Sequence, residues 1–206
     1  MRVVLFDVDG VLLDSYAGYC EVWSRWCLLR EIDLEIAWAA THGRRPVETI
    51  AEVAPHLSPD EEYVVLKGLL NEVGDRFPPF KAAAPLLHAL PSKSWAVVTS
   101  GQRSTVLARF EAHGLPDPSV FVDGDDVAEG KPSPEGYLKA AELLGVGPMG
   151  CLVVEDAPAG VRAGKAAGMT VLAIASTHSA DSLSEADEVV PSLVQAGPHV
   201  REWLHG

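Results

Sequence analysis

Two aspartates near the N-terminus have the residue type and spacing of a catalytic or metal-binding pair. Asp7 and Asp9 follow the apolar run 3–6, which is too short for a helix and predicts a buried strand. Ligands bind at the carboxyl ends of strands in open α/β sheets, and residues two apart on an extended chain share a face. Adjacent carboxylates repel unless a cation or a shared proton reconciles them, and Mg²⁺ suits such a pair. An acidic turn without chemistry has the same pattern, so the pair is informative only with other motifs.

Three later stretches carry groups that could act on a phosphate. Thr99-Ser100-Gly101 stands between a predicted strand and a predicted helix. There a hydroxyl and backbone N–H groups can hold phosphoryl oxygens, although the same arrangement can be an ordinary helix cap. Lys131 in Gly130-Lys131-Pro132 is either a functional cation or a solvated loop lysine. Glu155 and Asp156 follow another predicted strand, as a second acidic pair or as a helix start with a favourable dipole.

Together these stretches resemble the four signatures of the haloacid dehalogenase superfamily, in the right order. The first is Asp7-Val8-Asp9-Gly10-Val11-Leu12-Leu13-Asp14-Ser15, and the last is Glu155-Asp156-Ala157-Pro158-Ala159-Gly160. The resemblance covers nearly the whole chain. Residues 95–101 and 155–160 are most similar to the glycerol-3-phosphatase and 2-deoxyglucose-6-phosphatase branch. The resemblance implies a Mg²⁺-dependent phosphatase whose partner is a small phosphorylated sugar or polyol.

The resemblance also implies roles for the two aspartates of the first signature and for the lysine. Asp7 is expected to attack phosphorus and form an aspartyl-phosphate, which divides one difficult hydrolysis into two steps. Asp9 is expected to protonate the leaving alkoxide and then to activate water. Asp9 argues against a true haloacid dehalogenase, which lacks this second aspartate. Lys131 is expected to bridge Asp7 and the phosphate and to offset charge during transfer.

The remaining site residues expected from the family hold the metal and the phosphate. The metal ligands are Asp7, the backbone carbonyl of Asp9, and Asp156, with Glu155 reached through a bound water. Thr99, Ser100 and Gly101, together with Lys131, are expected to bind the phosphoryl oxygens.

Residues 16–79 show helical spacing and helix start signals but no strand pattern. The predicted helices cover 16–27 and 33–40, start again at Pro46, and run from Pro59 to Gly74, with serine N-caps at Ser15 and Ser58. By resemblance, residues 16–79 form a small all-helical cap domain inserted after the first strand. The loop His42-Gly43-Arg44-Arg45 could contact the far end of a substrate, since arginine offers forked donors. Exposed arginines are common, so a purely surface role remains open.

From residue 80 onward, strands and helices alternate, which predicts an α/β fold with a Rossmann-like parallel sheet flanked by helices. The core domain is expected to comprise residues 1–15 and 80–206. The predicted strands are 95–99, 120–122, 151–155, 170–174 and an edge strand at 188–190, and the predicted helices are 105–113, 134–144, 159–167 and 199–204.

Composition narrows the function classes. The chain has 206 residues, with 16 basic residues against 29 acidic ones and a formal charge of −13, which disfavours binding to nucleic acid or to anionic membranes. No apolar run approaches the length of a membrane span. Cys20, Cys27 and Cys151 are odd in number and lack Cys-x-x-Cys spacing, so a reducing cytoplasm is expected. The sequence is compatible with a monomer and does not determine the oligomeric state.

Two other functions remain as alternatives. A β-phosphoglucomutase-like isomerase would return the phosphoryl group to a sugar. That branch usually carries histidine where this chain has Tyr19, and the loop 42–45 lacks the mutase pattern, so the resemblance favours the phosphatase. A noncatalytic phosphosugar-binding protein is disfavoured because every expected catalytic group is present.

Overall fold

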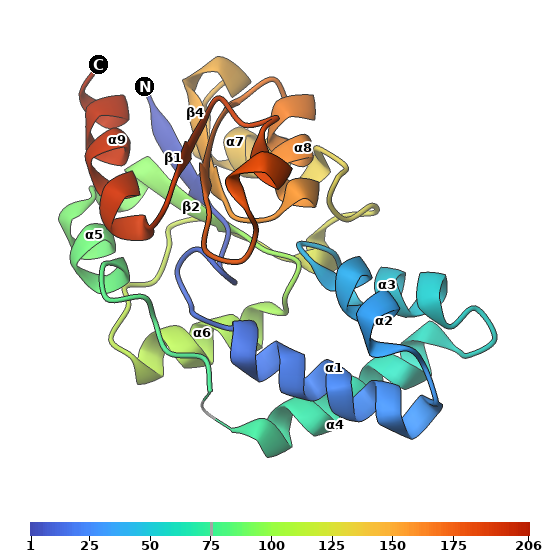
Figure 1. Ribbon diagram of the computed structural model, residues 1–206. Helices are drawn as coiled ribbons and strands as arrows, with labels where there is room; N and C mark the ends of the chain where they lie inside the picture. Colours follow the sequence, from blue (N-terminus) through green and yellow to red (C-terminus); the bar gives the residue numbers. More distant parts are fainter. Residues whose placement is uncertain (75) are drawn as a thin grey trace.

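The computed structural model describes residues 1–74 and 76–206, and a six-stranded parallel sheet forms its centre (Figure 1). The strand order is β3-β2-β1-β4-β5-β6, and every pairing is parallel. The strands are β1 (Val3–Phe6), β2 (Trp95–Val98), β3 (Phe121–Val122), β4 (Cys151–Glu155), β5 (Thr170–Ile174) and β6 (Glu188–Val190). Because β2 and β4 flank β1 on opposite sides, the strand order reverses at β1, where open α/β sheets bind ligands. The predicted fold class is confirmed.

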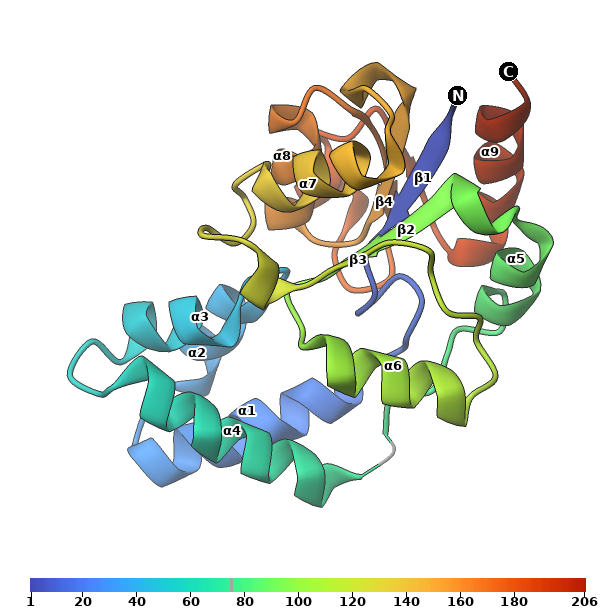
Figure 2. The ribbon, with the colours of Figure 1, turned by 180° about the vertical axis from the view of Figure 1, so that it is seen from behind.

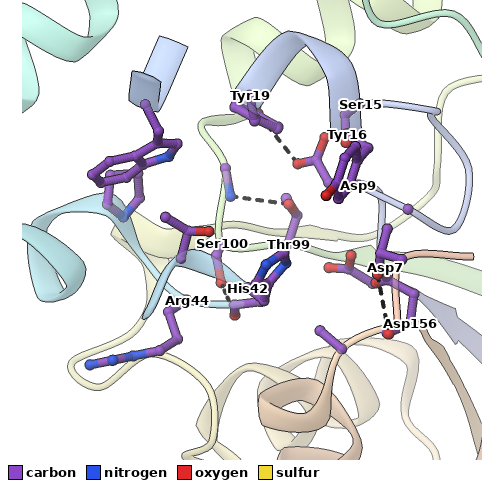
Figure 3. Close-up of a pocket in the computed structure, with 18 of the residues that line it drawn as sticks. Asp7, Asp9, Ser15, Tyr16, Tyr19, His42, Arg44, Thr99, Ser100 and Asp156 are labelled. Atoms are coloured by element: carbon purple, nitrogen blue, oxygen red, sulfur yellow. Dashed lines mark hydrogen bonds between the residues drawn. The ribbon is translucent and has the colours of Figure 1, made fainter. Parts of the chain in front are cut away.

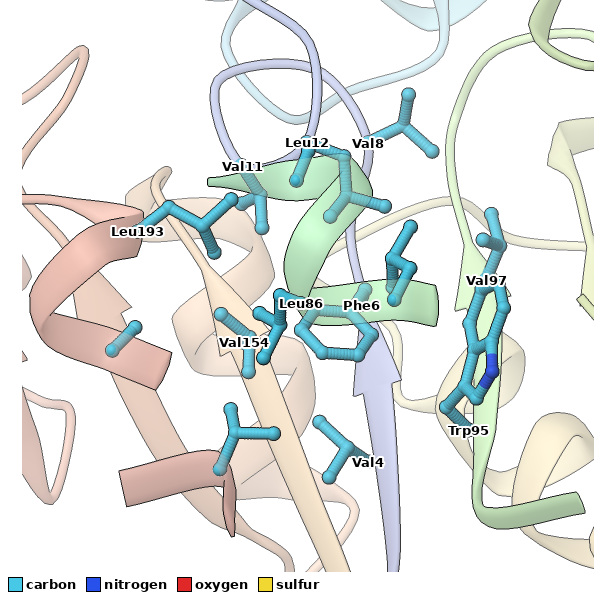
Figure 4. Packing of buried hydrophobic residues seen from close by; sticks show 14 of the residues in the cluster. Val4, Phe6, Val8, Val11, Leu12, Leu86, Trp95, Val97, Val154 and Leu193 are labelled. Atoms are coloured by element: carbon cyan, nitrogen blue, oxygen red, sulfur yellow. The ribbon is translucent and has the colours of Figure 1, made fainter. Parts of the chain in front are cut away.

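Helices cover both faces of the sheet, because the strands alternate buried side chains between two apolar layers (Figures 1 and 2). Val4 and Phe6 face the layer of α5 (Ala83–Ala89), α6 (Arg103–Ala112) and α9 (Leu193–His205), and Figure 4 shows this packing. Val3 and Leu5 face α7 (Glu135–Leu144) and α8 (Pro158–Ala166). Short 3-10 helices lie at Ser92–Ser94, Gly124–Asp126, Pro148–Gly150 and Ala180–Leu183.

A separate group of helices follows β1 and is here called the helical insert (described residues 16–73). It comprises α1 (Tyr16–Arg30), α2 (Leu34–Thr41), α3 (Pro46–Val53) and α4 (Pro59–Val73). These helices lie together beyond one end of the sheet, below it in Figures 1 and 2. Their inward faces share an apolar cluster of their own, including the buried Trp26, Ile50 and Leu66. The insert therefore carries a core distinct from the two layers beside the sheet.

Two helices differ from the sequence-based prediction by more than shifts of a few residues at their ends. Helix α5 is absent from that prediction, and α9 begins at Leu193 rather than at His199. Both helices contain a proline, and proline inside a helix removes one backbone hydrogen bond. In α9 the buried Ala196 and Val200 stand on either side of Pro198, so apolar burial against the sheet outweighs the local cost.

The two serine N-caps lie where the sequence predicts them, but without a capping hydrogen bond. Ser15 and Ser58 occupy the N-cap positions of α1 and α4, but neither side chain makes a capping hydrogen bond. The first turn of α4 instead carries three acidic residues, which interact favourably with the helix dipole.

Two further features bear on the sequence-based expectations. No helix in the described ranges 1–74 and 76–206 is both long and apolar enough to cross a membrane. Cys20, Cys27 and Cys151 are free thiols, and the last two are buried.

Candidate active site

Two backbone hydrogen bonds extend the sheet by one residue and fix the first functional side chains. The Asp7 amide donates to Val154 O at 3.0 Å, directly after β1. The Thr99 amide donates to Val122 O at 3.0 Å, directly after β2. Asp7 and Thr99 are therefore held at the carboxyl edge of the sheet by its own ladder. Figure 3 shows these two residues around one cavity with Asp9 and Asp156.

Lys131 lies at the centre of a buried ionic network. Its Nζ donates to Asp7 Oδ1 at 2.6 Å, to Glu155 Oε1 at 2.6 Å and to Val98 O at 3.3 Å. Burial alone would lower the pKa of Lys131, but the negative charges of Asp7 and Glu155 raise it instead. The ammonium group is thus held in its charged form against Asp7.

Glu155 is fully buried, and both of its carboxylate oxygens are engaged. Besides Lys131, Oε1 accepts a hydrogen bond from Tyr137 OH at 2.7 Å. Oε2 accepts from the backbone amides of Asp156 at 3.0 Å and Ala157 at 3.3 Å. A Cβ at Gly160 would overlap this carboxylate, so glycine is required there. With four donors, Glu155 organises its neighbours rather than reaching freely toward a ligand.

The donor set of the acidic cluster fits a divalent cation. Asp7, Glu155 and Asp156 are buried, and one oxygen from each lies within 4.8 Å of the others. Burial raises the pKa of Asp7 to about 8, with Lys131 opposing and Glu155 adding to the increase. Burial, Glu155 and Asp7 also raise the pKa of Asp156 well above its usual range. One ammonium does not balance three carboxylates, and hard oxygen ligands of this kind suit Mg²⁺.

The turn directly after Asp9 also requires a glycine. Gly10 has a φ of +81°, and a Cβ there would overlap the Asp156 carboxylate. Asp156 Oδ2 accepts a short hydrogen bond from the Thr177 hydroxyl. These contacts hold the Asp156 carboxylate close to the turn that follows Asp7.

Asp9 is linked to the helical insert. Its Oδ2 accepts a hydrogen bond from Tyr19 OH at 3.4 Å, and that hydroxyl accepts one from Arg109 Nη1 at 3.4 Å. Burial raises the pKa of Asp9. The positive charge of Arg109 opposes this increase, as do polar contacts with the Ser15 and Tyr19 side chains. Among the described residues, Asp9 Oδ1 is the buried side-chain oxygen without a hydrogen-bond partner. A group that must exchange a proton with a ligand needs such an unengaged oxygen.

The predicted phosphate-binding residues lie beside this carboxyl group. Thr99 Oγ1 accepts from the Gly101 amide at 3.0 Å, which shapes the loop after β2. Ser100 Oγ donates to Gly43 O at 2.9 Å, so the hydroxyl of this core loop contacts the insert. All three residues line the cavity, whereas Lys131 lies behind it in the adjoining one.

The insert supplies an aromatic wall opposite the acidic groups. His42 stacks edge-on between Trp38, with ring centroids 5.0 Å apart, and His178, at 4.5 Å. Burial lowers the pKa of His42 to about 4, with a smaller contribution from His178. The imidazole is therefore neutral near pH 7. Other members of this wall are Tyr16, Tyr19 and Trp23.

The two arginines of the insert loop have separate surroundings. Arg44 lines the cavity, but its Nη1 donates to Glu52 at 2.5 Å, and Figure 3 shows the side chain directed away from Asp7. Arg45 does not line this cavity. Its guanidinium contacts Glu48 and the backbone of the loop 124–128.

Four contributors to the site have no recognisable signal in the sequence. Tyr137 lies on a helix face, Thr177 and His178 lie in the loop after β5, and Arg109 lies on α6. No local motif marks these residues, because each reaches the site through tertiary packing.

Comparison with known proteins identifies relatives over nearly the full chain. The family described as haloacid dehalogenase-like hydrolase matches residues 1–168. Hexitol phosphatase A of Escherichia coli is 37% identical over 93% of this chain and 91% of its own. Glycerol-1-phosphate phosphohydrolase 1 of Saccharomyces cerevisiae is 35% identical over 90% and 79%. 2-Deoxyglucose-6-phosphate phosphatase 1 of the same yeast is 32% identical over 93% and 87%.

Solved structures give the same fold. A hydrolase from Pseudomonas syringae superposes with a TM-score of 0.84 over 98% of this chain and 99% of that one, at 23% identity. A protein titled putative beta-phosphoglucomutase from Bacteroides vulgatus superposes with a TM-score of 0.83 over 100% and 89%, at 27% identity.

Proposed function

The chain belongs to the haloacid dehalogenase-like hydrolase family and is a phosphatase of that family, and we propose that its substrate is a small sugar or polyol phosphate. The relatives named as phosphatases act on a hexitol, a glycerol and a deoxyglucose phosphate, which supports this substrate class. The substrate class rests on these relatives. The observation that carries the phosphoryl-transfer chemistry is the contact of Lys131 Nζ with Asp7 Oδ1 at 2.6 Å, inside a buried acidic cluster.

In the first half of the proposed reaction, an Asp7 carboxylate oxygen attacks phosphorus. The bond between phosphorus and the substrate oxygen breaks, and an aspartyl-phosphate forms. Asp9 donates a proton to the leaving alkoxide. The Lys131 ammonium remains beside Asp7 and stabilises the negative charge that develops on the phosphoryl oxygens.

In the second half, Asp9 accepts a proton from water. The water oxygen attacks phosphorus, the bond to Asp7 breaks, and inorganic phosphate leaves. Thr99, Ser100 and Gly101 line the cavity where phosphoryl oxygens would bind.

We assign the metal to Mg²⁺, held by Asp7, Asp156 and the backbone carbonyl of Asp9. Glu155 acts from behind, because its oxygens already accept four hydrogen bonds. When bound, Mg²⁺ would offset the charge of the carboxylates and the phosphoryl group and favour the ionised form of Asp7.

We further propose that residues 16–79 act as a cap over a core of residues 1–15 and 80–206. The aromatic wall of the insert faces the acidic edge of the sheet across one cavity. Such a cover excludes bulk water and completes the substrate pocket. His42, Gly43 and Arg44 of the insert loop line this pocket, where they can meet the alcohol part of the substrate.

A sugar-phosphate isomerase of the β-phosphoglucomutase type is the second candidate, because a structure so titled is 27% identical with a TM-score of 0.83. Purified protein with Mg²⁺ should be screened against hexitol, glycerol and hexose phosphates, with inorganic phosphate and isomer formation both measured. The phosphatase proposal expects phosphate release on a polyol or sugar phosphate. Isomer formation without phosphate release would replace it with the isomerase.

A further inference from the structure

Arg45 uses its whole guanidinium group to hold the helical insert against the core. Nη1 donates to Gly124 O at 3.2 Å and Val127 O at 3.1 Å, and Nη2 donates to Ala128 O at 3.0 Å. The remaining two donors face one oxygen of Glu48, with Nε at 2.8 Å and Nη2 in a shorter contact. All five N–H groups of the side chain are engaged, so Arg45 has no donor left for a substrate.

Glu48, in the first turn of α3, extends this contact to the residue before Lys131. The Gly130 amide donates to Glu48 Oε1 at 3.0 Å, and Gly130 directly precedes Lys131. Burial would raise the pKa of Glu48, but hydrogen bonds from Arg45 and from the Gly130 amide lower it, so the carboxylate is charged. One ion pair of the insert thus binds both ends of the core loop 124–130.

The same stretch of the insert contacts two more core loops. The Ser100 hydroxyl donates to Gly43 O at 2.9 Å. A Cβ at Gly43 would lie 3.0 Å from Ala157 Cβ, in the loop after β4, so these two segments are in close contact. The segment 43–48 therefore touches the loops that carry the phosphate-binding, lysine and acidic motifs.

We propose that Arg45 and Glu48 are a positioning pair, which couples the seating of the helical insert to the placement of Lys131 against Asp7. Lysine cannot replace Arg45, because an ammonium is a point charge with three donors and cannot match a planar fork that binds three carbonyls and a carboxylate. The kinetic part of this inference rests on the proposed phosphatase function. The structural part, the ordering of loop 124–130, does not.

The test measures backbone amide hydrogen exchange across 124–131 together with phosphate release. The variants are Arg45→Ala, Arg45→Lys and Glu48→Gln, and the substrates are the best sugar phosphate and p-nitrophenyl phosphate, both with Mg²⁺. We expect exchange in 124–131 to be at least about 10-fold faster, the effect of losing a hydrogen bond to a charged group. We expect kcat to fall by a similar factor on both esters, because both need Lys131.

Arg25→Ala is the matched control. Arg25 pairs with Glu21 and Glu72 inside the insert, and its side chain is 42% exposed, so an ion pair is lost without a core contact. Neither exchange in 124–131 nor kcat should change. Arg45→Lys serves if the alanine variant does not fold.

Four outcomes separate the alternatives. Unchanged exchange in 124–131 would overturn the proposal. Faster exchange with unchanged kcat would overturn the link to Lys131, and a loss confined to the sugar phosphate would make Arg45 a substrate contact. If the wild-type protein hydrolyses no phosphate ester but exchange is faster in the variants, the loop ordering would be supported and the proposed function refuted.

Discussion

Tyr19 of the helical insert donates a hydrogen bond to Asp9 Oδ2 at 3.4 Å, across the boundary between the insert and the core. Arg109, on the core helix α6, donates to the same hydroxyl at 3.4 Å and lies 3.5 Å above the Phe77 ring. The carboxyl that we assign to proton transfer therefore accepts a hydrogen bond from the insert, through a hydroxyl that a core arginine also contacts. Tyr19 also occupies the place where the mutase branch usually carries histidine.

Tyr19→Phe should reduce turnover of sugar phosphates while leaving activated esters nearly unchanged. The bonds to the hydroxyl are long, so we expect a loss of about 3- to 10-fold in kcat. Asp9→Asn should show the same selectivity with a larger loss, because p-nitrophenol leaves without a proton. The measurement compares kcat on a sugar phosphate and on p-nitrophenyl phosphate for each variant. Equal losses on the two esters would remove Asp9 and Tyr19 from proton transfer.

Metal removal should abolish phosphate release, and Mg²⁺ should restore it while Ca²⁺ restores it poorly. Ca²⁺ takes more ligands in a looser geometry than this compact carboxylate set offers. Mg²⁺ should also raise the melting temperature of the wild-type protein, because a ligand that binds the native state stabilises it. Asp156→Asn should weaken that thermal shift. Full turnover after exhaustive chelation would contradict the metal assignment.

Arg44→Ala should lower kcat/KM for the best sugar phosphate by about 10- to 150-fold, the loss expected for one hydrogen bond to a charged donor. Turnover of p-nitrophenyl phosphate should change little, since that ester lacks the hydroxyls that Arg44 would bind. In the structure, Arg44 pairs with Glu52, whose side chain is 57% exposed, so the guanidinium can exchange that partner for a substrate. Glu52→Gln separates the two effects, because it frees Arg44 without removing it. An Arg44→Ala protein with the wild-type substrate ranking and rates would refute this role.

The insert should lose stability in acid through Glu62. Glu62 Oε2 accepts hydrogen bonds from Arg30 Nε and Trp26 Nε1, both at 2.8 Å, and chiefly the Arg30 bond lowers the pKa of Glu62. A carboxyl whose pKa is lower in the folded than in the unfolded protein stabilises the fold in full at any pH above its unfolded pKa. That stabilisation is lost as pH falls through the folded value.

Melting temperatures of wild type and Glu62→Gln, measured from pH 7 down to pH 3, test this linkage. We expect the variant to melt a few degrees lower at pH 7 and the difference to shrink below the ordinary glutamate range. Glu72→Gln is the matched control, because its partner Arg25 and its own side chain are exposed. A difference that is constant with pH would contradict the assignment.

How far the sequence predicts this molecule depends on where each residue lies. Asp7, Thr99 and Glu155 stand at strand ends, where short apolar runs and family signatures coincide, so the sheet and the acidic edge were both predictable. The partners of those residues were not. Tyr137 contacts Glu155 from a helix face, and His178 contacts His42 from a loop far along the chain. No local sequence pattern predicts either contact.

The insert loop shows the same limit at neighbouring positions. Arg44 and Arg45 are equivalent by residue type and spacing, yet one lines the cavity and the other binds the loop before Lys131. The backbone direction at the start of α3 separates them, and that direction depends on how the insert packs on the core. Helix α5 was not predicted for a related reason. It has a proline in its first turn, and the packing of its apolar face against the sheet stabilises it.

The central claim is that Asp7 carries the phosphoryl group during turnover. The most direct measurement is mass spectrometry of protein quenched in acid during turnover of its best sugar phosphate, with Asp7→Asn as the parallel sample. We predict a phosphoryl group on the wild-type peptide that contains Asp7. The variant should show neither a phosphoryl group on that peptide nor phosphate release. An Asp7→Asn protein that still releases phosphate at the wild-type rate would contradict the account.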